Sequence, residues 1–193
     1  METSFYDLSL LVSPGKVFTP RLATEALVDA ALERIDGKPV RAADVGTGTG
    51  AVAVALAVNR PGLEVWATDT SEAAVELARA NAERHGVADR VHVVRGDILD
   101  PVPLPVDLVV ANLPHLPERA HDERYDGEPQ EAVYAPGDGL GPYRRLLNAC
   151  HDGKLVTPGG TVLIQFHRKP LAADCWGLED LRAELEDRAE ASA

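Results

Sequence analysis

The sequence predicts a doubly wound α/β fold, in which a mainly parallel sheet carries helices on both faces. Short apolar runs of strand character alternate with segments of helical periodicity, and this alternation is typical of βαβ units. Residues 51–59 are almost wholly apolar with helical spacing, so this segment is expected to be a buried crossover helix. A glycine-rich turn precedes it, at the place where such sheets bind ligands.

Length and composition fit one globular domain, residues 1–193. Of the 193 residues, 45% are hydrophobic and 26% are charged. No apolar run approaches the roughly 20 residues needed to cross a bilayer, and the N-terminus lacks the features of a signal peptide. Cys150 and Cys175 are too few for a disulfide framework. We therefore expect a cytoplasmic protein with reduced thiols and no membrane segment.

Charge and histidine spacing argue against two classes of partner. The formal net charge is −12, whereas a protein that binds nucleic acid through phosphates needs a basic surface. Scattered arginines could still form a local patch, but they more often decorate exposed helix faces. The histidines lack metal-ligand spacing, even where His115, His121 and Asp122 stand close together. Neither nucleic acid nor a metal is expected.

The expected elements follow in order after a lead-in, residues 1–23, that reads as extended as far as residue 20. Capping residues, apolar periodicity and Gly/Pro stops place helices at 24–35, 51–59, 71–85 and 142–155. Strands are expected at 40–45, 64–69, 91–94, 106–111 and 160–166. The segment 116–141 is rich in Pro, Gly and charge, and its length makes it a candidate functional loop.

The glycine turn is the first candidate binding motif. It comprises Asp44, Gly46, Thr47, Gly48 and Gly50. Glycines let the backbone turn sharply and approach a ligand closely. Gly46, Gly48 and Ala51 also satisfy the dinucleotide pattern, so the turn alone leaves two cofactor classes open. The carboxylate of Asp44 favours a cofactor with a positively charged amino-acid end, because it would repel a pyrophosphate.

Two further acidic positions follow the next strands. Asp69, followed by Thr70, ends the second strand, where a carboxylate can accept both hydroxyls of a ribose. Asp97 after the third strand could accept a hydrogen bond from an adenine amino group, and Ile98 could pack on the adenine ring. In this order the motifs predict a nucleoside cofactor.

The fourth motif, Asn112-Leu113-Pro114-His115, follows the fourth strand, and here the chain resembles the HemK/PrmC-type protein-glutamine N5-methyltransferases. That family carries Asn-Pro-Pro-Tyr at this point. The resemblance covers residues 5–166, and its other pieces are the lead-in 17–25 with Phe18 and Arg21, the glycine turn, Glu128-Pro129, the segment 137–143 and Pro158-Gly159-Gly160. It implies a Rossmann-like domain, S-adenosylmethionine as cofactor, and Phe18, Arg21, Asn112 and His115 near the acceptor.

The residue types of this motif suit methyl transfer to nitrogen. An amide nitrogen is a poor nucleophile because its lone pair is delocalised. Two acceptors that hold both N–H bonds would direct the lone pair and stabilise the developing charge. The side-chain oxygen of Asn112 and the backbone carbonyl of Leu113 are the candidates. Neither a metal nor a covalent intermediate is required, because proximity and orientation supply the rest.

The chain departs from the family pattern at several positions. Leu113 replaces the first proline, and His115 replaces the aromatic residue that would pack over the reacting nitrogen. His115 could stack or act as a base. The chain begins almost directly at the lead-in, whereas bacterial family members carry a helical N-terminal domain. The tail 167–193 shows no sixth or seventh strand, so either the sheet stops at five strands or the tail has diverged. We expect an acidic helix at about 178–191, and an uncovered sheet edge would suit a homodimer.

We therefore predict an S-adenosylmethionine-dependent methyltransferase that acts on an amide or amino nitrogen. The acceptor is either a protein glutamine or a small molecule or peptide, and the departures from the family favour the latter; a carboxylate or hydroxyl acceptor is open if His115 acts as base. Two other classes remain. One is an NAD-dependent oxidoreductase on the same kind of sheet, and the other is a non-catalytic module that binds S-adenosylmethionine.

Overall fold

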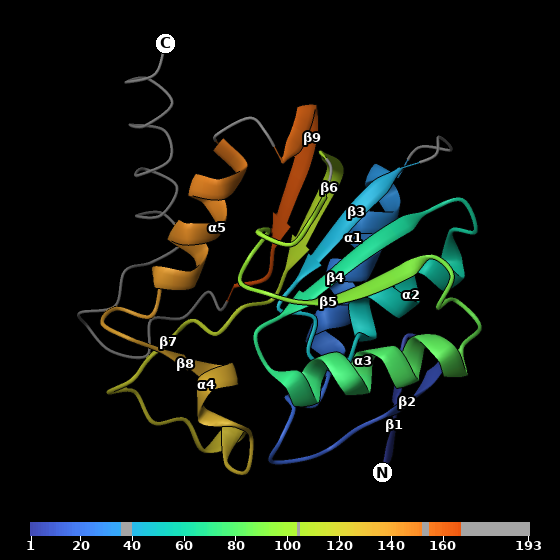
Figure 1. Ribbon diagram of the computed structural model, residues 1–193. Coiled ribbons are helices and arrows are strands. Elements are labelled where there is room, and N and C mark those ends of the chain that lie inside the picture. The colour runs from blue at the N-terminus through green and yellow to red at the C-terminus, as the bar shows by residue number, and fades with distance from the viewer. Residues whose placement is uncertain (36–39, 104, 152–154, 167–193) are drawn as a thin grey trace.

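A five-stranded parallel sheet organises the chain, as the sequence predicts. The computed structural model describes residues 1–35, 40–103, 105–151 and 155–166 (Figure 1). The strands of this sheet are β3 (Arg41–Val45), β4 (Glu64–Asp69), β5 (Val91–Arg95), β6 (Val106–Ala111) and β9 (Val156–Ile164). They lie in the order β5-β4-β3-β6-β9, and all neighbours are parallel. The winding direction therefore switches between β3 and β6, where such sheets bind ligands.

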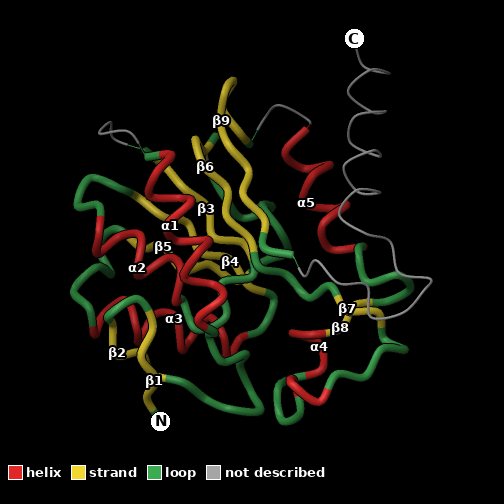
Figure 2. The backbone as a smooth tube through the Cα atoms, turned by 180° about the vertical axis from the view of Figure 1, so that it is seen from behind, coloured by secondary structure: helices red, strands yellow, loops and turns green. Residues whose placement is uncertain are grey.

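Helices pack against both faces of the sheet. They are α1 (Glu25–Arg34), α2 (Ala51–Asn59), α3 (Glu72–Arg84) and α5 (Gly141–His151). Figures 1 and 2 show α1, α2 and α3 grouped together, with α5 apart from them beside β9. The first three share one hydrophobic cluster with the sheet, and α5 contributes to a second. The apolar α2 is buried from Ala51 to Ala57, which explains its composition.

The lead-in contains a hairpin where the sequence suggested a simple extended segment. β1 (Glu2–Phe5) pairs antiparallel with β2 (Leu8–Leu11). The two turn residues, Tyr6 and Asp7, have positive φ angles of 49° and 60°, a conformation usually signalled by Asn or Gly. Contacts with α1 stabilise it: the backbone N–H of Tyr6 donates to Glu25 at 2.8 Å, and its hydroxyl donates to Asp29 at 2.7 Å. Tertiary contacts thus replace the missing local signal.

The last strand of the sheet begins earlier than expected, at Val156, and ends at Ile164. Its register against β6 shifts between the pairs Val106–Val156 and Leu108–Thr161. Residues 157–160 fill this irregularity, and Gly159 has a φ of +82°. The sequence placed the start of this strand at residue 160, but the structure places residues 157–160 in a bulge within it.

The segment between β6 and α5, expected as a loop, folds into a small unit. Its elements are β7 (Leu116–Pro117), η2 (Glu123–Tyr125), α4 (Gln130–Val133) and β8 (Tyr134–Ala135), and the 3-10 helix η1 (Leu22–Thr24) precedes α1. β7 pairs parallel with β8, while Leu116, Tyr125 and Val133 form a core cluster of their own. Figure 1 shows the unit beside the carboxyl ends of β6 and β9. It therefore forms one wall of the ligand-binding edge.

The tail lies outside this description. The predicted acidic helix at 178–191 belongs to residues 167–193. Gly37, the stop signal that the sequence offers for the helix at 24–35, falls within residues 36–39. Both lie outside the described residues. Within the described part of the chain β5 and β9 form the two edges of the sheet. The homodimer stays a prediction.

Asn81 joins the lead-in to the glycine turn. Its side chain is fully buried on α3. Its oxygen accepts from the Leu11 backbone N–H at 2.7 Å, and its nitrogen donates to the carbonyls of Leu11 at 3.0 Å and Thr49 at 2.8 Å. One amide group thus satisfies buried backbone groups of β2 and of the turn after β3.

Replacing Asn81 by Ala is expected to lower the free energy of unfolding by about 3 kcal/mol, because three backbone groups, one of them in a fully buried hydrogen bond, lose their partner. Urea denaturation of both proteins measures the change. Asn59→Ala serves as the control, since Asn59 donates one hydrogen bond, to Ala55 on its own helix. Equal destabilisation by the two variants would contradict this account of Asn81.

Candidate functional site

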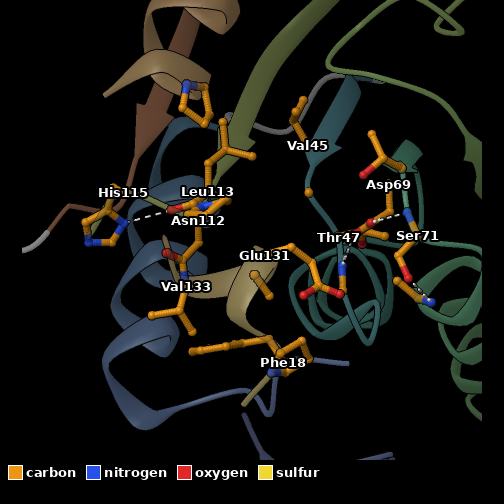
Figure 3. A pocket seen from close by; sticks show the side chains of 18 of the residues that line it. Phe18, Val45, Thr47, Asp69, Ser71, Asn112, Leu113, His115, Glu131 and Val133 are labelled. Carbon is orange, nitrogen blue, oxygen red and sulfur yellow. Dashed lines mark hydrogen bonds between the residues drawn. The ribbon is translucent and has the colours of Figure 1, made fainter. Parts of the chain in front are cut away.

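A cavity of about 830 Å³ opens where the carboxyl ends of β3, β4 and β6 meet (Figure 3). Its walls also include the lead-in and the unit around α4. The residues predicted for the site that line it are Phe18, Arg21, Asp44, Gly46, Thr47, Gly48, Asp69, Thr70, Asp97, Ile98, Asn112, Leu113, Pro114 and His115. The fold thus brings together residues that span almost a hundred positions of sequence.

Gly50 is the predicted site residue that does not line this cavity. It caps the N-terminus of α2 with a φ of +79°, and a Cβ there would lie 3.0 Å from atoms of Ala78. The glycine is therefore needed for close packing of the turn against α3 rather than for ligand contact.

Backbone donors of the glycine turn are already paired. The N–H groups of Gly46 and Thr47 both donate to the carbonyl of Thr68 at 2.9 Å. The N–H of Gly48 donates to Asp69 at 2.9 Å. Dinucleotide sites use such N–H groups to bind the pyrophosphate, so this arrangement offers a phosphate little.

Asp44 lies beneath the turn and is 3% exposed. One carboxylate oxygen accepts from the Thr47 hydroxyl at 2.6 Å and from the Ala53 backbone N–H at 3.1 Å. Burial nevertheless raises the pKa of Asp44 to about 6, because the charged form loses its hydration. A cationic group in the cavity would stabilise this carboxylate, whereas a phosphate would destabilise it.

Asp69 is held rigidly at the end of β4. One oxygen accepts from the Ser71 N–H at 2.9 Å, and the other accepts from the Gly48 N–H at 2.9 Å (Figure 3). Each carboxylate oxygen retains a second lone pair for a ligand. The geometry suits the two hydroxyls of a ribose, as the sequence suggested.

The segment after β5 combines an ion pair with a strained residue. Asp97 pairs with Arg145 of α5, a cavity-lining residue that sequence analysis did not identify. Ile98 adopts a φ of +52°, which is unfavourable for a β-branched side chain. Its carbonyl accepts from the Thr68 hydroxyl at 2.7 Å, which helps to hold this conformation. Strain of this kind concentrates at ligand sites.

Asn112 follows β6 and is oriented by Thr24, at the end of η1. Its side-chain nitrogen donates to the hydroxyl of Thr24 at 3.2 Å, and Thr24 is itself 5% exposed. Because this bond uses the nitrogen, the side-chain oxygen is left as an acceptor for a group in the cavity. Thr24 belongs to the lead-in segment of the family resemblance, yet its contact with Asn112 could not be read from the sequence.

Tyr143 fixes the backbone after Asn112. This fully buried residue accepts from the Leu113 N–H at 3.0 Å and donates to the Gln165 carbonyl at 2.5 Å. The Leu113 side chain also packs against Gly46, where an added Cβ would lie 2.6 Å from it. Leu113 thus has tertiary restraints in place of the rigidity that a proline would give.

His115 is turned back onto its own loop. Its Nδ1 lies 2.7 Å from the Leu113 carbonyl, and since a carbonyl only accepts, Nδ1 carries the hydrogen. The ring packs 5.1 Å from the Phe166 ring, on the side of the loop away from Asp69 in Figure 3. His115 thus orients the Leu113 carbonyl. The Tyr143 hydroxyl also lies 3.3 Å from this carbonyl, but its single hydrogen goes to the nearer Gln165 carbonyl at 2.5 Å, so the Leu113 oxygen keeps a second lone pair for another donor.

An aromatic cluster closes the lead-in side of the cavity. The guanidinium of Arg21 lies 5.4 Å from the centre of the Phe18 ring and 4.6 Å from that of Tyr125. Arg21 also pairs with Glu128 at 3.5 Å, and the N–H of Thr19 donates to Glu128 at 3.0 Å. Glu128 is part of the family resemblance, but neither Glu128 nor Tyr125 was predicted from the sequence as a site residue.

The described residues contain neither a metal-binding cluster nor a membrane-spanning helix. No group of three His, Cys, Asp or Glu side chains there is placed to hold a metal ion. No helix in the described part of the chain is both long and apolar enough to span a membrane.

Comparison with protein families gives a match over residues 19–125 to the methyltransferase small domain. This range covers the lead-in from Thr19 onward, the glycine turn and the Asn112 loop.

Individual relatives extend the comparison. The chain is 38% identical over 171 residues to a release factor glutamine methyltransferase of Gloeobacter violaceus, covering 82% of this chain and 57% of that protein. It is 40% identical over 168 residues to the protein of the same name from Moorella thermoacetica, covering 83% of this chain and 58% of the relative. The chain thus spans less than two thirds of the length of these relatives.

A solved structure supports the fold assignment. The crystal structure of ribosomal protein L11 methylase from Lactobacillus delbrueckii subsp. bulgaricus superposes with a TM-score of 0.55 and 26% identity. The superposition covers 78% of this chain and 63% of that one.

The raised pKa of Asp44 predicts a specific pH dependence of stability. The folded protein holds the proton more tightly than the unfolded chain, so this carboxyl favours folding below about pH 4, and the contribution is lost as the pH rises through about 6. The shift corresponds to about 3 kcal/mol. Relative to Asp44→Asn, the wild-type free energy of unfolding should fall by that order between pH 4 and pH 7.

Chemical denaturation of both proteins across this pH range measures the difference. Parallel pH profiles for wild type and Asp44→Asn would show that burial does not hold the proton on Asp44.

Proposed function

Because this chain belongs to the methyltransferase small domain family, we propose that it transfers a methyl group from S-adenosylmethionine to the side-chain amide nitrogen of a glutamine in a protein or peptide. The observation that carries the proposal is the orientation of Asn112. Thr24 holds its nitrogen, so that its oxygen is available in the same cavity as Asp44 and Asp69.

The glycine turn and the residues after β4 and β5 suit the cofactor. Asp44 would bind its ammonium group, Asp69 the ribose hydroxyls, and Asp97 with Ile98 the adenine. Gly46 and Gly48 adopt positive φ angles of 72° and 56°, and a Cβ on Gly48 would meet no atom closer than 4.0 Å, so the turn leaves space on this side. When bound, S-adenosylmethionine supplies an electrophilic methyl group.

The loop after β6 provides the two acceptors for an amide nitrogen. The Asn112 oxygen would accept one N–H and the Leu113 carbonyl the other, which concentrates the nitrogen lone pair on one side. Thr24, Tyr143 and His115 hold these two oxygens in place before the acceptor arrives. Such preorganisation lowers the reorganisation needed at the moment of reaction.

The names of the relatives favour a protein glutamine as acceptor. Sequence departures at Leu113 and His115 favoured a small molecule or peptide as the acceptor, but in the structure both residues have roles that are compatible with a protein acceptor. Tyr143 restrains Leu113, and His115 supports the Leu113 carbonyl. A base role for His115 is not favoured by its position, because the ring packs on Phe166 and lies on the side of the loop away from Asp69 in Figure 3. We also propose that this protein is cytoplasmic, which is compatible with a protein acceptor.

Neither alternative class is favoured by the site. An NAD-dependent oxidoreductase would need donors for a pyrophosphate, and the N–H groups of Gly46, Thr47 and Gly48 are engaged within the protein. A non-catalytic module would not need an oriented amide beside the cofactor residues.

Replacing Asn112 by Ala is expected to slow methylation of glutamine-containing peptides by about a hundredfold, since one acceptor for the developing charge is lost. Binding of S-adenosylhomocysteine should weaken by much less. Mass spectrometry of the peptides under single-turnover conditions measures the rate, and calorimetry measures the affinity.

A matched pair at Thr24 separates orientation from folding. Thr24→Ser keeps the oxygen that accepts from Asn112 and should preserve the rate, whereas Thr24→Val should slow it. If Asn112→Ala methylated the peptides as fast as the wild-type protein, the proposed role of Asn112 in the reaction would be wrong.

A further inference from the structure

A carboxylate that has no partner among the described residues projects into the cavity. Glu131 lies on α4, in the unit between β6 and α5, and its side chain is exposed. Figure 3 shows its carboxylate in the cavity, between the side formed by Asn112 and Val133 and the side formed by Thr47 and Asp69. Among the described residues no hydrogen bond or ion pair engages Glu131.

The two arginines that line the cavity do not neutralise Glu131, because each pairs with another carboxylate. Arg21 pairs with Glu128 and donates to the Arg124 carbonyl at 2.8 Å. Arg145 pairs with Asp97. Both guanidinium groups are therefore committed to other carboxylates, which leaves the charge of Glu131 available to a ligand.

The charge that remains on the walls is predominantly negative. Once these ion pairs are set aside, the charged lining residues are Lys16, Asp44, Asp69, Glu118 and Glu131. The proposed function assigns Asp44 and Asp69 to the cofactor. Glu118 and Glu131 belong instead to the unit around α4, next to the acceptor loop. The acceptor side of the cavity thus carries negative charge that the cofactor does not use.

A neutral glutamine amide does not require this charge. Its two N–H groups find acceptors in Asn112 and Leu113, so a further carboxylate would contact another part of the acceptor. An unpaired carboxylate attracts cations and repels anions, and therefore discriminates between partners by charge.

We propose that Glu131 selects acceptors that carry a basic side chain, Lys or Arg, beside the methylated glutamine. This inference rests on the proposed function. Phe18 adds a second contact surface, since its ring lines the same cavity as Glu131 (Figure 3). The aliphatic stem of a basic side chain can pack on such a ring while its charged end reaches the carboxylate.

Three peptides test the proposal, identical except that the residue beside the glutamine is Arg, norleucine or Glu. We expect the wild-type protein saturated with S-adenosylhomocysteine to bind the Arg peptide about tenfold more tightly than the Glu peptide, as one exposed charge contact allows. Glu131→Gln should remove most of this preference, and Glu131→Lys should reverse it. Values of kcat/KM with S-adenosylmethionine should follow the same order.

Glu123→Gln is the matched control, because Glu123 is exposed on the same unit and does not line the cavity. It changes the net charge equally and should leave the preference intact. Reversal in Glu131→Lys is the outcome that a merely structural role for Glu131 would not produce.

Equal affinity of the wild-type protein for the three peptides, or an unchanged preference in Glu131→Gln, would overturn the proposal. Failure of the proposed function looks different, since no peptide would then be methylated. In that case the affinities of the three peptides, measured by calorimetry on the protein saturated with S-adenosylhomocysteine, would still decide the role of Glu131.

Discussion

The hydrogen bonds that tie the glycine turn to the end of β4 are the constraint on which the rest of the site depends. The Thr68 carbonyl receives two N–H groups of the turn, and the Asp69 carboxylate receives a third. These bonds engage the backbone N–H groups of the turn, which would otherwise be available to bind an anion. They also leave Asp44 buried beneath the turn without a cation beside it. One local arrangement therefore disfavours a phosphate and favours a positively charged ligand.

Asp44 links this arrangement to stability. Its carboxyl is costly to ionise in the folded protein, and a bound ammonium group would relieve that cost. The ligand-free protein is then less stable at neutral pH than a variant with an uncharged residue at position 44 would be. Such a loss of stability at a functional site is common in proteins. Across the cavity, Asn112 and Leu113 depend on side chains from two other segments, Thr24 of η1 and Tyr143 of α5, and on His115 of the same loop. The reacting loop is thus positioned by tertiary contacts.

Local signals made much of this structure predictable from the sequence. The strands and helices from Arg41 to Ala111 follow strong periodicity, and the glycine turn and Asp69 stand at strand ends, where parallel sheets bind ligands. The hairpin at Tyr6-Asp7 was missed because its turn lacks Gly or Asn and is held by α1. The direction of His115 was missed because it depends on one hydrogen bond within the folded loop. Glu131 and Arg145 were missed because only the folding of the α4 unit and of α5 brings them to the cavity.

Calorimetric titration with S-adenosylmethionine and, separately, with NAD tests the central claim most directly, when it is repeated on Asp69→Ala. The account predicts binding of S-adenosylmethionine that Asp69→Ala abolishes, and no binding of NAD. Binding of NAD without binding of S-adenosylmethionine would contradict it, and would reduce the Asn112 loop to a structural turn.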